Sequence, residues 1–326
     1  MKKHCKFHNI LFISILTLIN GCNTKPSGNE FVVKRCDIAL MNVDTSHFNE
    51  EIISLADDFP VFFGKAKHDT SGMADLFNFA TDSVIRKVGN DCEKAYPANY
   101  KFNDLLNALH NVQTNVDTFN LKSIYTYISG LDFEYPAIYN DTTLIIAIDM
   151  YLGSDYPIYN SPILPKYKVN RFDEDYMARD CLLQIAEKFN IEQAECTKLI
   201  DFMIYHGKNL KFAETNLDNT KQSTLLGFTE PQMEWCKENE KFVWEYLVTN
   251  DILFSSDSQI IRRFIDDGPF TSIFSREAPA MLGRWIGYNI VDSYCRHNHV
   301  DIFDIMNDGD AQKIFMQSRY RANNGK

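Results

Sequence analysis

From Tyr176 onward, apolar residues recur every three or four positions, the spacing that predicts amphipathic helices. We expect helices near 176–189, 192–216, 230–250, 257–266 and 280–296. Thr229-Glu230-Pro231-Gln232 predicts a capping box at the start of the third, and Ser256 to Gln259 predicts another for the fourth. Gly268-Pro269 marks the end of that fourth helix.

The first half of the chain mixes helical and strand periods. Residues 31–40 predict a strand, and 46–58, 74–88 and 100–118 predict helices. Lys122 to Ser129 alternates like a strand, and Ala137 to Tyr139 with Leu144 to Ile148 predicts a hairpin. Because Leu144 to Ile148 is apolar on both faces, we expect a central strand covered by helices. The pattern predicts an α+β fold, in which a small, mainly antiparallel sheet in the N-terminal half packs with a predominantly helical C-terminal half.

The first 21 residues carry the signature of a lipoprotein signal peptide. Three lysines precede an apolar run, Ile10 to Ile19, that is too short to span a bilayer comfortably. The run ends in Leu18-Ile19-Asn20-Gly21-Cys22, which looks like a lipobox. We therefore predict cleavage before Cys22, a diacylglyceryl group on its thiol and a further acyl chain such as palmitate on its amine, which together give stable anchoring.

Residues 22–30 contain Pro, Gly and Ser and almost nothing apolar, which predicts a flexible tether. Residues 31–326 are long enough for one large domain or two small ones, and we favour a single domain. No acidic cluster follows Cys22 to act as a surface-export signal, so we expect the lipid-anchored domain to face the periplasm within the cell envelope.

Charge narrows the classes of partner. The whole chain carries −11, and removal of the three signal-peptide lysines leaves −11 − 3 = −14. Repulsion from phosphates argues against nucleic acid and against binding to anionic headgroups. We therefore expect membrane contact only through the lipid anchor, and proteins or small molecules as partners.

Six cysteines remain after Cys5 is removed and Cys22 is lipidated: Cys36, Cys92, Cys181, Cys196, Cys236 and Cys295. An even count outside the cytoplasm permits disulfides. The spacings are wide, however, and Cys181 and Cys236 fall on apolar helix positions, where cysteine acts as a small hydrophobe. Free thiols are therefore favoured.

The sequence shows no catalytic or metal-binding motif. A hydrolytic zinc site usually places two histidines four residues apart on one helix, and no such pair exists here. His297 and His299 lie at a predicted helix end, where solvated histidines are favoured by the helix dipole. His206 is a single histidine on a helix, more typical of packing than of ligation. We predict no metal, no cofactor and no catalytic residues, although sequence does not show which carboxylates face each other.

Three stretches carry a family resemblance: Phe59-Pro60-Val61-Phe62-Phe63, Leu144 to Gly153, and Gly283 to Tyr294. Together with the lipobox and Lys34-Arg35-Cys36-Asp37, they resemble the gliding motility-associated lipoprotein GldB family of the Bacteroidota over nearly the whole mature chain. The family commonly has Arg-Phe-Asp where Cys36 stands, and a Pro-Gly-Arg-like sequence near Met281-Leu282. These departures leave the resemblance intact.

The resemblance implies a cell-envelope lipoprotein of the gliding apparatus, which works with other envelope proteins of the gliding or secretion machinery. Because relatives occur in bacteria that do not glide, it equally implies support of surface-protein secretion or envelope assembly.

Seven residues in these stretches are candidates for an interaction or structural motif: Asp149, Gly153, Gly283, Arg284, Trp285, Gly287 and Tyr288. Asp149 follows a buried strand, where it can be functional or can cap the following turn. Gly283 and Gly287 lie one turn apart and allow close approach of another element, while Trp285 packs into the core. Arg284 and Tyr288 suit acidic groups in a groove, or the polar face of a helix.

Two functions of different classes remain open. The leading hypothesis is a non-catalytic component that positions or stabilises partners in an envelope complex. The alternative is an envelope hydrolase with a zincin-like fold, since a small sheet followed by helices is typical of those metallopeptidases. The corresponding helix here, Met177 to Gln184, contains no histidine, so a zincin-like fold without its metal fits better than an active peptidase.

Overall fold

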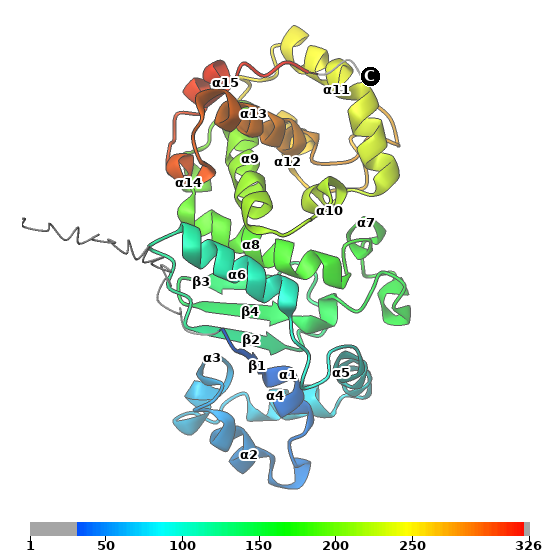
Figure 1. The fold of residues 1–326 in the computed structure, drawn as a ribbon. Coiled ribbons are helices and arrows are strands. Elements are labelled where there is room, and N and C mark those ends of the chain that lie inside the picture. Colours follow the sequence, from blue (N-terminus) through cyan, green and yellow to red (C-terminus); the bar gives the residue numbers. More distant parts are fainter. Residues whose placement is uncertain (1–30, 323–326) are drawn as a thin grey trace, which may run out of the picture. The chain divides into compact units, whose positions relative to one another are not determined.

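The computed structural model describes residues 31–322, which pack as one compact unit. One mixed sheet and two groups of helices build it (Figure 1). The strands are β1 (Val33–Arg35), β2 (Ser123–Tyr127), β3 (Ala137–Asn140) and β4 (Thr143–Ala147). Between β1 and β2 run α1 (Cys36–Met41), α2 (Phe48–Leu55), α3 (Pro60–Phe63), α4 (Met73–Thr81), α5 (Ser83–Ala95) and α6 (Asn103–Asn115).

The helices after the sheet form the C-terminal half. They are α7 (Lys166–Val169), α8 (Met177–Phe189), α9 (Leu199–Asn216), α10 (Gln222–Leu226), α11 (Glu230–Thr249), α12 (Ser258–Ile265), α13 (Leu282–Asn298), α14 (Ile302–Ile305) and α15 (Ala311–Ser318). The predicted α+β class is therefore confirmed, with the small sheet in the N-terminal half.

The sheet has the order β1-β2-β4-β3, and two of its three pairings are parallel. Only the β3–β4 hairpin is antiparallel, as predicted for that pair. The expectation of a mainly antiparallel sheet was wrong. The hairpin depends on local sequence, whereas tertiary packing determines which strands pair with β2. The chain passes from β1 to β2 through a helical crossover, the kind of connection that parallel pairing requires.

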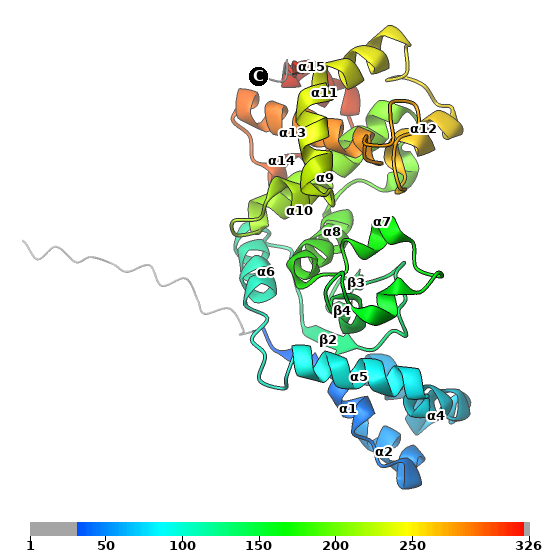
Figure 2. The ribbon, with the colours of Figure 1, turned by 90° about the vertical axis from the view of Figure 1, so that its right-hand side faces the viewer.

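Alternate residues of the sheet serve two hydrophobic cores. Ile124, Leu144 and Ile146 face the larger core, which α6 and α8 cover. The next residue, Tyr125, belongs to the smaller core, which α1 to α4 build. In Figures 1 and 2, α1, α2 and α4 lie below β2. The predicted central position of β4 is confirmed, but its second face is only partly covered, because Ile145 is half-buried there.

Several predicted element boundaries moved. Residues 31–40 were expected to form one strand, but the strand ends at Arg35 and α1 begins at Cys36. Leu40 and Met41 face the smaller core from this helix, so packing overrides local strand preference. The expected helix over 74–88 is divided between α4 and α5, because the Asp82 carboxylate accepts hydrogen bonds from the backbone N–H groups of Val84 and Ile85 at 2.8 and 3.0 Å.

Two helix starts also differ from expectation. The N-cap of α12 is Asp257, whose carboxylate accepts from the Gln259 N–H at 2.7 Å, so the predicted Ser256 capping box was wrong. Helix α9 begins at Leu199 instead of residue 192, after a short 3-10 turn. The capping box of Thr229 and Gln232 at α11 is confirmed.

Helices α9 and α13 touch backbone to backbone through glycines. A Cβ atom added to Gly287 would lie 1.8 Å from the carbonyl oxygen of Met203, and one added to Gly207 would lie 2.4 Å from that of Gly287. A side chain at either position must push the helices apart. The crossing therefore depends on glycine for space, since neither residue has a positive φ.

We predict that Gly287→Ala lowers the free energy of unfolding by about 3 kcal/mol or more, because the added methyl group meets backbone that cannot rotate away. Urea unfolding of the purified chain measures the change. Gly64→Ala is the matched control, because the nearest atom to its added Cβ would be 3.7 Å away. Equal midpoints for the two variants would contradict the close approach.

Candidate functional site

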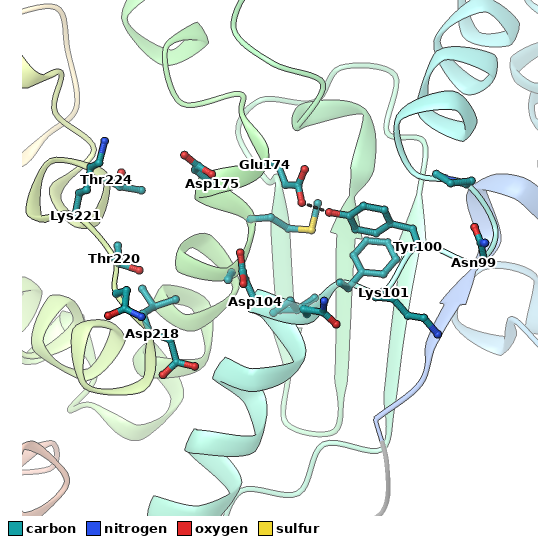
Figure 3. A pocket seen from close by; sticks show the side chains of 18 residues that line it. Asn99, Tyr100, Lys101, Asp104, Glu174, Asp175, Asp218, Thr220, Lys221 and Thr224 are labelled. Carbon is teal, nitrogen blue, oxygen red and sulfur yellow. Dashed lines mark hydrogen bonds between the residues drawn. The ribbon is translucent and has the colours of Figure 1, made fainter.

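A polar groove of about 610 Å³ lies on the surface of residues 31–322. Three segments far apart in the sequence line it: 97–105 before and within α6, 174–178 at the start of α8, and 217–224 between α9 and α10. Figure 3 shows Tyr100 and Lys101 on one side of the groove, with Asp175, Asp218 and Lys221 opposite. The groove is thus assembled from the sheet half and the helical half together.

Most residues that line the groove have side chains that can form hydrogen bonds. Four carboxylates line it against two lysines, Lys101 and Lys221, which gives the lining a net charge of 2 − 4 = −2. The Tyr100 hydroxyl donates to the Glu174 carboxylate across the groove (Figure 3). Burial, followed by the negative charge of Asp175, raises the pKa of Glu174. The net negative charge of the lining suits polar or cationic groups.

The groove wall contains a backbone outlier. Phe102 has φ of +47°, a left-handed conformation that costs free energy for a residue with a side chain. Its ring is held from several sides: Tyr100 lies 4.7 Å away edge-on, Tyr96 stacks at 6.1 Å, and the Arg35 guanidinium lies 5.6 Å from its centre. Such strain persists only where surrounding contacts fix it, which is common at binding sites.

Asp149 lies outside the groove and is fully buried. Its carboxylate accepts from the backbone N–H groups of Ser129 and Leu131 at 2.9 and 2.8 Å and from the Ser129 hydroxyl. Burial raises the pKa of Asp149, while these hydrogen bonds act in the opposite direction. The carboxylate thus stabilises the turn after β2. The capping role considered from sequence placed it instead at the turn that follows Asp149.

The carboxyl end of β4 is filled by aromatic side chains. The Tyr159 hydroxyl donates to the carbonyl oxygen of Asp149 at 2.5 Å, and the Tyr96 hydroxyl donates to that of Tyr151. Gly153 follows with φ of +94°, in a turn that glycine adopts without strain. Neither Asp149 nor Gly153 lines the polar groove.

The stretch from Gly283 to Tyr288 lies on α13, inside the helical half. Gly283 approaches the carbonyl oxygen of Phe264 on α12, whereas Gly287 approaches α9, so the two glycines serve different neighbours. Trp285 is 2% exposed, as its predicted core position requires. The Tyr288 hydroxyl donates to the Glu214 carboxylate at 2.5 Å, and Nε of Arg284 donates to the carbonyl oxygen of Ile265 at 2.7 Å.

Two further findings concern residues 31–322. No group of three or more His, Cys, Asp or Glu side chains is arranged there to hold a metal ion. None of the helices in this range has the length and apolar character needed to cross a membrane. The six cysteines are buried free thiols, and His297 and His299 are exposed at the end of α13 as predicted. The signal peptide, Cys22 and the tether lie outside the described residues, and the conclusions about them stay predictions.

Comparison with protein families gives a match to the model described as gliding motility protein GldB, over residues 23–322. The chain belongs to the GldB family. No curated protein and no solved structure matches it. Family membership confirms the resemblance derived from the sequence and ties this chain to gliding motility.

The polar groove of this GldB-family chain was not anticipated from sequence. Its acids and lysines sit in three loop-rich segments without a shared motif, and only the fold brings them together. The seven candidate residues, by contrast, lie in regular elements or tight turns, and none lines the groove. A signal was available in the Asp, Asn and Thr residues of 217–220, which are typical of a surface loop.

We predict that Asp149→Asn lowers the free energy of unfolding by roughly 1–3 kcal/mol. The amide NH₂ group of asparagine would face a backbone N–H group that now donates a hydrogen bond to the carboxylate. Thermal unfolding of the purified chain measures the loss. Asp132→Asn provides the control, since Asp132 is exposed in the same turn. An unchanged midpoint for Asp149→Asn would refute the structural role of the carboxylate.

Proposed function

We propose that this protein is a lipid-anchored, non-catalytic component of the gliding machinery of the cell envelope, supporting gliding and the secretion of surface proteins. The observation that carries the proposal is the family match, which begins at residue 23, directly after the predicted lipid-bearing Cys22. A lipoprotein cleaved before Cys22 would present the whole matched region outside the cytoplasm, with the periplasm as its proposed location.

The groove gives this proposal a contact surface. Its lining can hydrogen-bond a partner through hydroxyl, amide and carboxylate groups, and its net negative charge favours a segment that carries lysine or arginine. The strained Phe102 supports a surface that is held in shape before the partner arrives. We therefore propose that the groove binds another protein of the envelope machinery.

The alternative, an envelope hydrolase with a zincin-like fold, receives no specific support. Helix α8, which would carry the two zinc-binding histidines, presents Arg179, Asp180 and Cys181 in that region. Arg179 and Asp180 form an ion pair at 2.6 Å, and Cys181 is fully buried. These side chains hold the helix in the core.

A gene deletion complemented by variants tests the anchoring. We expect wild type to restore colony spreading and surface-protein secretion, and Cys22→Ala to fail although its globular domain is unchanged. Membrane fractionation with an immunoblot shows whether the Cys22→Ala chain is absent from the membrane fraction. Normal spreading and secretion in the deletion strain would overturn the proposed function.

A second set of strains tests the groove. The double variant Asp175→Lys with Asp218→Lys reverses two exposed carboxylates of the lining, and we expect it to reduce spreading and secretion severalfold at normal protein level. Glu234→Lys with Glu238→Lys makes the same change of charge on the exposed face of α11 and should have no effect. Full activity of the groove variant would exclude the groove as the contact surface.

A further inference from the structure

A second, smaller cavity lies inside the helical half, between α8, α9 and α13. It has a volume of about 50 Å³. Polar side chains reach it from all three helices: Arg179 and Glu187 from α8, His206 and Asn209 from α9, and Arg284 from α13. Arg284 belongs to the Gly283-Arg284-Trp285 stretch that the sequence singled out and that the proposed function does not use.

Arg284 brings a positive charge to the cavity, and the acids whose charges act on it, Asp267, Asp266 and Glu187, form no ion pair with it. Two arginines of this region are already paired, Arg171 with Asp267 and Arg179 with Asp180. Arg284 takes part in no ion pair of residues 31–322, and its one hydrogen bond goes from Nε to the carbonyl oxygen of Ile265. Burial lowers the pKa of its guanidinium to about 10, which leaves the group charged at neutral pH. A buried charge without a partner is costly.

His206 adds an unsatisfied donor or acceptor to the same cavity. Its Nε2 atom is buried and is the one such side-chain atom in the described part of the chain that lacks a hydrogen-bond partner. An unpaired buried polar atom costs roughly 1–3 kcal/mol. Burial, and secondarily the charge of Arg284, lowers the pKa of His206 well below its ordinary value, so the ring is neutral and carries one N–H.

Glu187 does not serve as an ion-pair partner for Arg284. It lines the cavity, yet it forms no ion pair with Arg284. Burial raises the pKa of Glu187, while the positive charge of Arg284 acts in the opposite direction.

We propose that this cavity binds a small anion with carboxylate or phosphate-like oxygens, held by the Arg284 guanidinium and His206 Nε2. The guanidinium fork matches such oxygens in geometry. A cavity of this volume has room for roughly three to five water-sized spheres, enough for a carboxylate group or a tetrahedral oxyanion. Water alone would satisfy the hydrogen bonds but would not form an ion pair with Arg284.

Anion titration of the purified mature chain tests the proposal, with inorganic phosphate and acetate as separate probes and chloride at equal ionic strength as reference. Calorimetry gives stoichiometry and affinity. The imidazole NMR signals of the six histidines, assigned with His206→Gln, report where the anion binds. We expect one anion per chain, and a shift of the His206 signal while the five others stay in place.

Arg284→Met should weaken binding roughly ten- to hundredfold, because it removes the charged donor while keeping the length of the side chain. Arg263→Met, on the exposed face of α12, is the matched control and should bind like wild type. If Arg284→Met shows no cooperative unfolding, His206→Gln decides, with weaker binding expected. If phosphate binds more tightly than acetate, the ligand is a tetrahedral oxyanion. If acetate binds more tightly, the ligand is a carboxylate. No saturation above the chloride reference, or unaltered affinity in the variants, would overturn the site.

Discussion

The helical half of this protein depends on the backbone contact between α9 and α13. At this crossing, the carbonyl oxygens of Met203 and Gly287 occupy the space in which Cβ atoms would otherwise stand. Two helices this close bury long rows of side chains on both sides of the contact. Helix α15 packs on α13, α8 packs on α9, and the larger core runs continuously from this crossing to the sheet.

The same crossing explains why charged groups meet inside the helical half. His206 directly precedes Gly207, and Arg284 lies between Gly283 and Gly287, so the close approach brings both side chains to one cavity. The polar groove arises differently. It lies where the segments before α6, α8 and α10 converge, and none of the glycines of the helix crossing lines it. The molecule thus combines a rigid interior cavity with a surface groove built from connecting segments.

Sequence patterns predicted what short-range physics controls. The β3–β4 hairpin, the Thr229 capping box and the helical second half all depend on residues a few positions apart. The parallel pairing of β1 with β2 joins segments about ninety residues apart, and nothing local in Val33–Arg35 indicates its partner. The role of Asp149 was missed for the same reason, because its carboxylate binds a turn 18 to 20 residues earlier. Glycine spacing on α13 indicated close packing, but not that Gly283 and Gly287 face different helices.

The placement of β1 has a mechanical consequence for an anchored protein. β1 is the first element after residues 22–30, so tension between a lipid on Cys22 and a partner held elsewhere on the domain would enter the fold at Val33. Load applied along a strand with a paired neighbour strains several hydrogen bonds at once instead of one after another. Arg35, the last residue of β1, donates two hydrogen bonds to the Asp37 carboxylate, which accepts a third from the Thr126 hydroxyl of β2 at 2.5 Å. The segment that would receive a pulling force is thus hydrogen-bonded to the neighbouring strand β2.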